Sequence, residues 1–146
     1  VAWQDNPNLF YLGMQDQFHT FNMFDAQAWY VRDIIMNKIS LPSNDEMEKD
    51  INNWVSKEEA LEDAHQMIDF QTDYCVDLCS SIDYPKIDFE LIRKNFYEWE
   101  DHKEENILTY RDKSFPSPVT GTVGPSHHTT WLEAMDDSMQ TYLKTK

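Results

Sequence analysis

The chain has 146 residues, and its 27 acidic against 12 basic side chains give it a formal net charge of -15. A surface this acidic repels a phosphate backbone and an anionic membrane, so neither nucleic acid nor a membrane is an expected partner. With 3 glycines, the chain contains no G-x-G-x-x-G or P-loop motif, so it cannot hold the phosphates of a dinucleotide in the usual way by itself.

The first predicted elements are a buried strand and an amphipathic helix. The run Leu9 to Leu12 is apolar and ends at Gly13, a residue that is free to adopt unusual backbone angles. A helix is predicted to begin near Asn22. Apolar residues recur in it at steps of three and four and are expected to face a core. They are Phe21, Phe24, Ala28, Val31 and Ile35.

Polar side chains fill the elbow between this strand and this helix. They are Gln15, Asp16, Gln17, His19 and Thr20. Such an elbow directs the unpaired N–H groups and the partial positive charge of the helix toward whatever lies above it, which favours an electron-rich ligand. Asp16 is its only carboxylate and is the candidate for contact with a cationic or polar substrate. Alternatively, Thr20 or Asn22 simply caps the helix, Asp16 is a structural acid, and the polar residues are solvated.

Two further helices are predicted downstream. Ser43 and Glu46 match a capping box for the first, whose residues Met47, Ile51, Trp54 and Val55 are expected to point inward as far as about Leu61. The second carries Ala64, Ile68, Cys75 and Leu78 inward and ends near Ser80. No strong helix breaker separates the two, so they could also form one bent helix. Cys75 and Cys79 are interpreted as reduced core thiols of a cytosolic protein.

A fourth helix is predicted after the Tyr84-Pro85 turn, with Asp88 as its cap. Its inward side comprises Leu91, Ile92, Phe96 and Trp99, and its charged end, Glu100 to Glu105, is expected to be solvated. Residues 109–129 are predicted to form a long ordered loop, followed by a helix that starts at Thr130. One strand among five helices has no neighbour for its backbone groups, which suggests that a sheet is missing and that the chain is a piece of a longer protein.

Arg111 is a candidate ligand for an anionic group. It is one of three arginines in an acidic chain and lies at the start of the Pro/Gly-containing loop, where a guanidinium could bind a phosphate or carboxylate through two parallel bonds. The alternative is a surface ion pair with Asp112 or Glu105. The five histidines show no metal-ligand spacing, so no metal site is expected.

Five segments of the chain closely resemble the C-terminal third of bacterial flavin-containing monooxygenases of the trimethylamine monooxygenase type. They read VAWQDNPNLFYLGMQDQ, NMFDAQAWYVRDIIM, LPSNDEM, FYEWEDHKEENILTYRDKSF and TGTVGPSHHTTWLEAMDDSM. The resemblance implies a chain that is mainly α in isolation and that forms the C-terminal strand-plus-helices segment of an α/β flavoprotein with two dinucleotide-binding domains. Residues 1–38 would be the last strand and helix of the FAD-binding domain, and residues 39–146 a helical C-terminal wrap.

The same resemblance implies an activity. NADPH would reduce FAD, O2 would form a C4a-hydroperoxyflavin, and a small tertiary amine such as trimethylamine would take up the distal oxygen to become an N-oxide. Gln17 and Thr20 match positions that contact FAD, Asp16 falls beside the substrate pocket, and Arg111, with Trp99 as a weaker candidate, falls at the NADP site.

The implied partners are the N-terminal portion of the same protein, which would carry the glycine-rich motifs, and a second copy in a cytoplasmic homodimer. The segment alone is expected to be inactive. The rival interpretation is an acidic helical interaction module, without catalytic activity, that binds a partner protein through its Trp and Met stripes.

Overall fold

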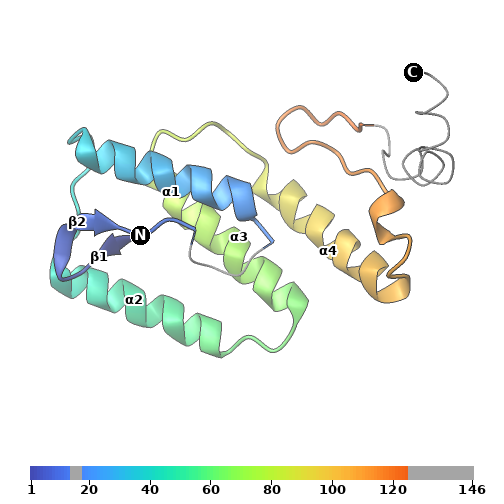
Figure 1. The fold of residues 1–146 in the computed structure, drawn as a ribbon, viewed down its shortest axis with the longest axis horizontal. Helices are drawn as coiled ribbons and strands as arrows, with labels where there is room; N and C mark the ends of the chain where they lie inside the picture. Colours follow the sequence, from blue (N-terminus) through green and yellow to red (C-terminus); the bar gives the residue numbers. More distant parts are fainter. Residues whose placement is uncertain (14–17, 125–146) are drawn as a thin grey trace, which may run out of the picture. The chain divides into compact units, whose positions relative to one another are not determined.

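The computed structural model describes residues 1–13 and 18–124, and the chain divides into two compact units between Phe89 and Glu90. The first unit contains β1 (Ala2–Trp3), β2 (Asn6–Phe10), α1 (Thr20–Ile35), α2 (Asn44–Glu59) and α3 (Ala64–Ser80) (Figure 1). The second unit contains all but the first residue of α4 (Phe89–Glu105) and a short 3-10 helix, Tyr110–Asp112. The chain is therefore mainly helical, as predicted. No helix in the described ranges is long and apolar enough to cross a membrane.

The strand of the first unit differs from the prediction in position, burial and pairing. β2 ends at Phe10, and Leu9 and Leu12 are 41% and 44% exposed, so the prediction of a buried strand over Leu9 to Leu12 is wrong for this chain. β2 also has a neighbour, because it pairs antiparallel with β1, with Trp3 opposite Asn6 across a two-residue turn. A strand of two residues is too short to show a hydrophobic period, which is why the sequence did not reveal it.

Helix α1 begins at Thr20 and buries the opposite face from the predicted one. Met23, Ala26 and Gln27 are buried, and α1 lies along α3 (Figure 1). The predicted inward residues Phe21 and Ile35 are instead 84% and 67% exposed. The helix carries apolar residues on both sides, so its periodicity could not indicate which side meets α3.

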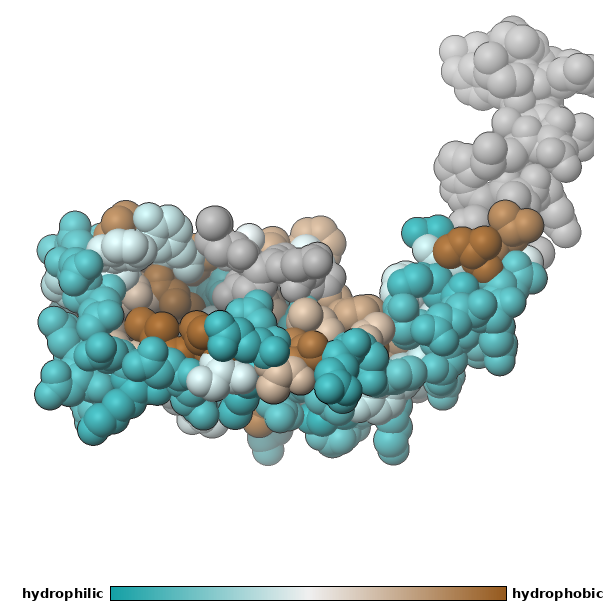
Figure 2. Space-filling view, turned by 90° about the horizontal axis from the view of Figure 1, so that it is seen from below, coloured by the Kyte–Doolittle hydropathy of each residue, from teal (hydrophilic) through white to brown (hydrophobic). Residues whose placement is uncertain are grey.

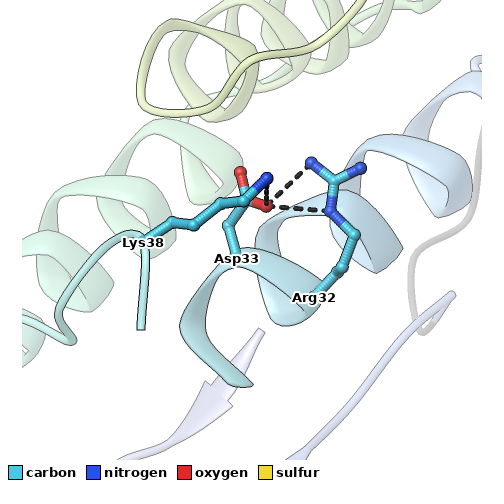
Figure 3. A network of polar contacts seen from close by, with 3 residues as sticks. All are labelled: Arg32, Asp33 and Lys38. Atoms are coloured by element: carbon cyan, nitrogen blue, oxygen red, sulfur yellow. Dashed lines mark hydrogen bonds and ion pairs between the residues drawn. The ribbon is translucent and has the colours of Figure 1, made fainter. Parts of the chain in front are cut away.

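Asp33 anchors the end of α1. Asn37 adopts a left-handed φ of 55°, and the backbone N–H of Lys38 donates to the carbonyl of Asp33 at 2.8 Å, in the pattern of a Schellman motif. One carboxylate oxygen of Asp33 contacts Arg32 at 2.7 Å and Lys38 at 3.5 Å (Figure 3). Burial by itself raises the pKa of Asp33, but the hydrogen bond and charge of Arg32, together with Lys38, outweigh burial and lower the pKa.

Helices α2 and α3 are separate, so the alternative of one bent helix is wrong. The predicted capping box is confirmed, with reciprocal bonds between Ser43 and Glu46, and α3 has its own cap at Asp63. Helix α3 buries Ile68, Cys75 and Leu78, as expected.

Helix α2 packs more lightly than predicted, because none of its residues is buried. The ring of Trp54 makes T-shaped contacts with those of Phe70 and Tyr74, with ring centroids 5.4 Å apart in both pairs, but Ile51 and Val55 remain 44% and 43% exposed. Figure 2 views the molecule from the side of α2 and shows hydrophobic residues reaching the surface among hydrophilic ones. The described residues therefore leave apolar side chains of α2 exposed to solvent on this face of the first unit.

In the second unit, α4 buries Ile92, as expected, and also Glu100. The prediction that Glu100 is solvated is wrong: it is 5% exposed and accepts two bonds from Lys103, at 2.6 and 2.8 Å. The following loop is ordered as far as it is described, with a bridge between Pro116 and Val123. The helix predicted from Thr130 lies outside the described residues.

Candidate functional site

The predicted site residues fall in both units. Thr20 is the first residue of α1, whereas Asp16 and Gln17 lie outside the described residues, so their predicted roles stay predictions. The two ends of the elbow that carries them, Gly13 and Phe18, are described. Trp99 and Arg111 lie in the second unit.

Two buried glutamines hold the ends of the elbow. The backbone N–H of Gly13 donates to Oε1 of Gln27 at 2.9 Å. The backbone N–H groups of Phe18 and His19 both donate to Oε1 of Gln71, at 2.8 and 3.4 Å. Gln27 and Gln71 are 1% and 2% exposed, on α1 and α3 respectively. The elbow is therefore fixed at both ends by side-chain amides that water does not reach.

A buried hydroxyl fixes the tautomer of His19. The hydroxyl of Thr72 donates its one hydrogen to the carbonyl of Ile68 at 2.7 Å, so it can only accept from Nε2 of His19, which lies 2.9 Å away. The Nε2 of His19 therefore carries a proton. The sequence placed His19 in the elbow without a role, and the structure makes it part of the anchor between α1 and α3.

The elbow starts at a position that requires glycine. Gly13 has a φ of +74°, and a Cβ added there would lie 2.9 Å from the ring of Phe24. A side chain at this position would therefore be strained, and the ring of Phe24 on α1 would have to shift to make room for it.

Among the described residues, no side chain caps the N-terminal end of α1. His19 occupies the N-cap position but makes no capping hydrogen bond, and the first turn contains no acidic residue. The alternative in which Thr20 or Asn22 caps the helix is therefore wrong. The partial positive charge of a 16-residue helix remains unneutralised by its own first turn, which suits an electron-rich group beside Thr20.

In the second unit, Tyr110 lies between the two predicted NADP residues, Trp99 and Arg111, and contacts both. The rings of Trp99 and Tyr110 meet edge to face with centroids 5.1 Å apart, and the guanidinium of Arg111 lies 4.3 Å over the ring of Tyr110. The Nζ of Lys103 lies 5.2 Å over Trp99. Tyr110 was not predicted as a site residue. Its place between the two candidates depends on the 3-10 turn, which has no strong signal in the sequence.

Arg111 is positioned to present its charge to solvent. It is exposed, and within the described ranges no carboxylate lies close enough to it to form an ion pair. The alternative of a surface pair with Asp112 or Glu105 is therefore wrong for this part of the chain. Stacking on Tyr110 orders the guanidinium while leaving its N–H edges available to an anion.

A cavity of about 570 Å³ in the first unit contains none of the predicted site residues. Its lining combines the aromatic rings of Tyr30, Trp54 and Tyr74 with the carboxylates of Asp50 and Asp77. Burial, and then the charges of both carboxylates, raise the pKa of Tyr30. Rings and carboxylates of this kind suit a cation. Lys57, which does not line the cavity, lies 4.4 Å over the ring of Trp54. Among the described residues, no group of His, Cys, Asp and Glu could hold a metal ion.

Comparison with known proteins finds strong similarity along the whole chain. The chain is 68% identical over 146 residues to a trimethylamine monooxygenase of Pelagibacter sp. (strain HTCC7211), covering all of this chain and 33% of that protein. It is 52% identical over 142 residues to a trimethylamine monooxygenase of Methylocella silvestris, covering 97% of this chain and 32% of that protein. The crystal structure of Tmm from Pelagibacter sp. strain HTCC7211 matches with a TM-score of 0.88 and 70% identity, over 97% of this chain and 32% of that one. No protein-family model matches.

The chain thus spans about a third of the length of the relatives that it matches. The resemblance to trimethylamine monooxygenases that the sequence predicted is confirmed, and so is the prediction that the chain matches only a portion of a longer protein.

Proposed function

We infer that this chain, which is similar along its whole length to a third of the trimethylamine monooxygenases, is the C-terminal portion of an FAD- and NADPH-dependent enzyme. The enzyme would convert small tertiary amines such as trimethylamine to their N-oxides. The observation that carries this proposal is the combination of 68% identity over every residue of the chain with a TM-score of 0.88. The names of the relatives favour an enzyme over the rival interaction module.

The first unit fits a flavin at the start of α1. When bound, FAD would supply the oxygen-transfer chemistry and NADPH the reducing hydride. The N-terminus of α1, for which the described residues supply no side-chain cap, would stabilise negative charge on the edge of the flavin, and the Thr20 hydroxyl would add a hydrogen bond. The role proposed for Gln17 is a second contact to FAD, and that for Asp16 is contact with the amine. The anchors Gln27 and Gln71 would hold the two described ends of the elbow, at Gly13 and Phe18.

The second unit fits the phosphate of a nicotinamide nucleotide. Arg111 is exposed and ordered by Tyr110, and it lies in a chain whose net charge of -15 would otherwise repel a phosphate. A guanidinium is the side chain that binds phosphate through two parallel bonds. Trp99 would hold the ring of Tyr110 through their edge-to-face contact. Its own contact with the nucleotide would be weaker than that of Arg111. The cytoplasmic location and the homodimer stay predictions from the resemblance.

A hybrid enzyme tests the proposal directly. In the hybrid, this chain replaces the matching third of the Pelagibacter HTCC7211 protein, and the remaining two-thirds alone serve as the control. We expect the hybrid to bind flavin, oxidise NADPH and form trimethylamine N-oxide, measured by mass spectrometry, whereas the control forms none. A hybrid that folds and retains flavin but forms no N-oxide would contradict the proposal.

A further inference from the structure

The cavity of about 570 Å³ in the first unit is lined by residues of α1, α2 and α3 and of the segments that precede and connect them. Each of the three helices contributes one aromatic ring, Tyr30 from α1, Trp54 from α2 and Tyr74 from α3. Aliphatic side chains complete the apolar part of the lining, among them Ile39, Leu41, Ile51 and Leu78. Small-molecule pockets have volumes of this order and a similar mainly apolar lining. The cavity is therefore large enough for an organic molecule of several heavy atoms.

Two carboxylates, Asp50 of α2 and Asp77 of α3, line the same cavity as the tyrosines. Burial raises the pKa of Tyr30, and the charges of both carboxylates raise it further. The same two charges contribute, after burial, to the raised pKa of Tyr74. Within residues 1–13 and 18–124, neither carboxylate forms a hydrogen bond or an ion pair with another side chain. The cavity therefore carries two negative charges that the described side chains do not neutralise.

The other ionisable groups of the lining leave these two charges available. Glu46 already accepts bonds from the backbone N–H and the hydroxyl of Ser43, at 2.9 and 2.6 Å. Burial lowers the pKa of the Val1 amino group, and the charge of Asp50 raises it. In the hybrid enzyme, Val1 is joined to a preceding residue, so this amine becomes an uncharged amide. A cation that balances Asp50 and Asp77 in the hybrid therefore has to come from solution.

Aromatic rings, aliphatic side chains and unpaired carboxylates together favour an organic cation over other ligands. The carboxylates repel an anion, and the described residues contain no group of His, Cys, Asp and Glu that could hold a metal ion. A quaternary ammonium spreads its charge over methyl groups and has no N–H, so it requires no hydrogen-bond acceptors. Ring faces and nearby negative charge are what bind such a cation. A ligand that also carries a carboxylate or a phosphate would be repelled by Asp50 and Asp77.

We propose that this cavity binds a quaternary ammonium cation of about the size of choline that carries no anionic group. The methyl groups of the ligand contact the rings of Tyr30, Trp54 and Tyr74, and Asp50 and Asp77 supply the opposite charge. The site goes beyond the proposed function, because a quaternary nitrogen has no lone pair and cannot be converted to an N-oxide. The cation is therefore a ligand of the protein and not a substrate of the proposed reaction.

Isothermal titration calorimetry on the hybrid enzyme tests the site, with choline chloride as the probe at constant ionic strength. Neohexyl alcohol, in which a carbon replaces the nitrogen of choline, has the same shape without the charge. Glycine betaine and phosphocholine have the same trimethylammonium group and an added anionic group. We expect choline to bind at least about tenfold more tightly than any of these three compounds.

Substitutions of the two carboxylates locate the bound cation. Asp50→Asn combined with Asp77→Asn should weaken choline binding by about tenfold or more, because both charges that oppose the ligand are removed. Glu48→Gln combined with Glu58→Gln is the matched control. It also removes two charges, from exposed positions of α2 that do not line the cavity, and should change the affinity by less than about twofold. All four positions are exposed, so these variants are expected to fold. The single variants Asp50→Asn and Asp77→Asn repeat the measurement if the double variant does not.

Failure of choline to bind, or equal affinities for choline and neohexyl alcohol, would overturn the proposal. Choline binding that survives the loss of both carboxylates would also overturn it, because the cation would then be held elsewhere. Equal binding of phosphocholine would indicate a lipid-type head group as the ligand and would contradict the charge argument. N-oxide formation is measured on the same samples. Its absence, with choline binding intact, would contradict the proposed function alone.

Discussion

Replacing Gln71 with leucine removes the acceptor that holds one end of the elbow. Leucine is close to glutamine in size, so the change keeps the packing around a side chain that is 2% exposed. It leaves the backbone N–H groups of Phe18 and His19 without the oxygen that now lies 2.8 and 3.4 Å from them. The end of the elbow is therefore expected to open more often.

The magnitude follows from the two distances. The bond from Phe18 has normal length and is worth about 1.5 kcal/mol, whereas the longer bond from His19 adds about 0.5 kcal/mol. Losing about 2 kcal/mol of local stability corresponds to roughly thirtyfold faster hydrogen exchange at these two amides.

Hydrogen exchange followed by mass spectrometry on the hybrid enzyme gives this rate. Gln66→Leu is the matched control, because Gln66 lies on the same helix and its Oε1 also accepts a backbone N–H, that of Glu62, at 2.8 Å. That bond is exposed to solvent, so water replaces it and the change should cost less than about 0.5 kcal/mol. Unchanged exchange at Phe18 and His19 in Gln71→Leu would refute the anchoring role of Gln71.

Four further predictions concern ligand binding and pH. Arg111→Ala should raise the apparent KM of the hybrid for NADPH by roughly tenfold or more, because one charge-assisted phosphate contact is worth about 1.5 to 3 kcal/mol. Asp16→Ala should lower amine turnover more than flavin content, whereas Thr20→Val should lower flavin retention, both measured by absorbance and N-oxide yield. Burial raises the pKa of Cys75 from 9.0 to about 12 and that of Cys79 to about 11. The contribution of the two thiols to the free energy of unfolding should therefore be fully present below about pH 9 and be lost as pH rises toward these values.

Each prediction has an outcome that contradicts it. An unchanged KM for Arg111→Ala would remove its phosphate role, and equal losses of turnover and flavin in Asp16→Ala would remove its substrate role. Unaltered flavin retention in Thr20→Val would do the same for the flavin contact. For the thiols, urea unfolding midpoints in Cys75→Ala should vary less above pH 9 than those of the unsubstituted chain, and an identical pH profile would refute the linkage.

The sequence alone determined most of the local structure. The capping box at Ser43 and Glu46, the buried residues of α3 and the burial of Ile92 in α4 all follow from short-range patterns. Hydrogen bonds between residues three or four apart and the spacing of apolar side chains depend only on residues that are close in the sequence. They can therefore be predicted without knowledge of the tertiary structure. The resemblance likewise depends on the order of residues alone.

The tertiary structure decided which surfaces meet. Periodicity shows that α1 has an apolar stripe, but it does not show that α3 covers the other side, because burial depends on which partner is present. The same holds for Tyr110, which joins Trp99 to Arg111 only after the chain turns back. Gln27 and Gln71 lie 14 and 53 residues from the backbone groups that they anchor, at Gly13 and Phe18. No local pattern encodes contacts over such separations, because they form only when distant elements pack together.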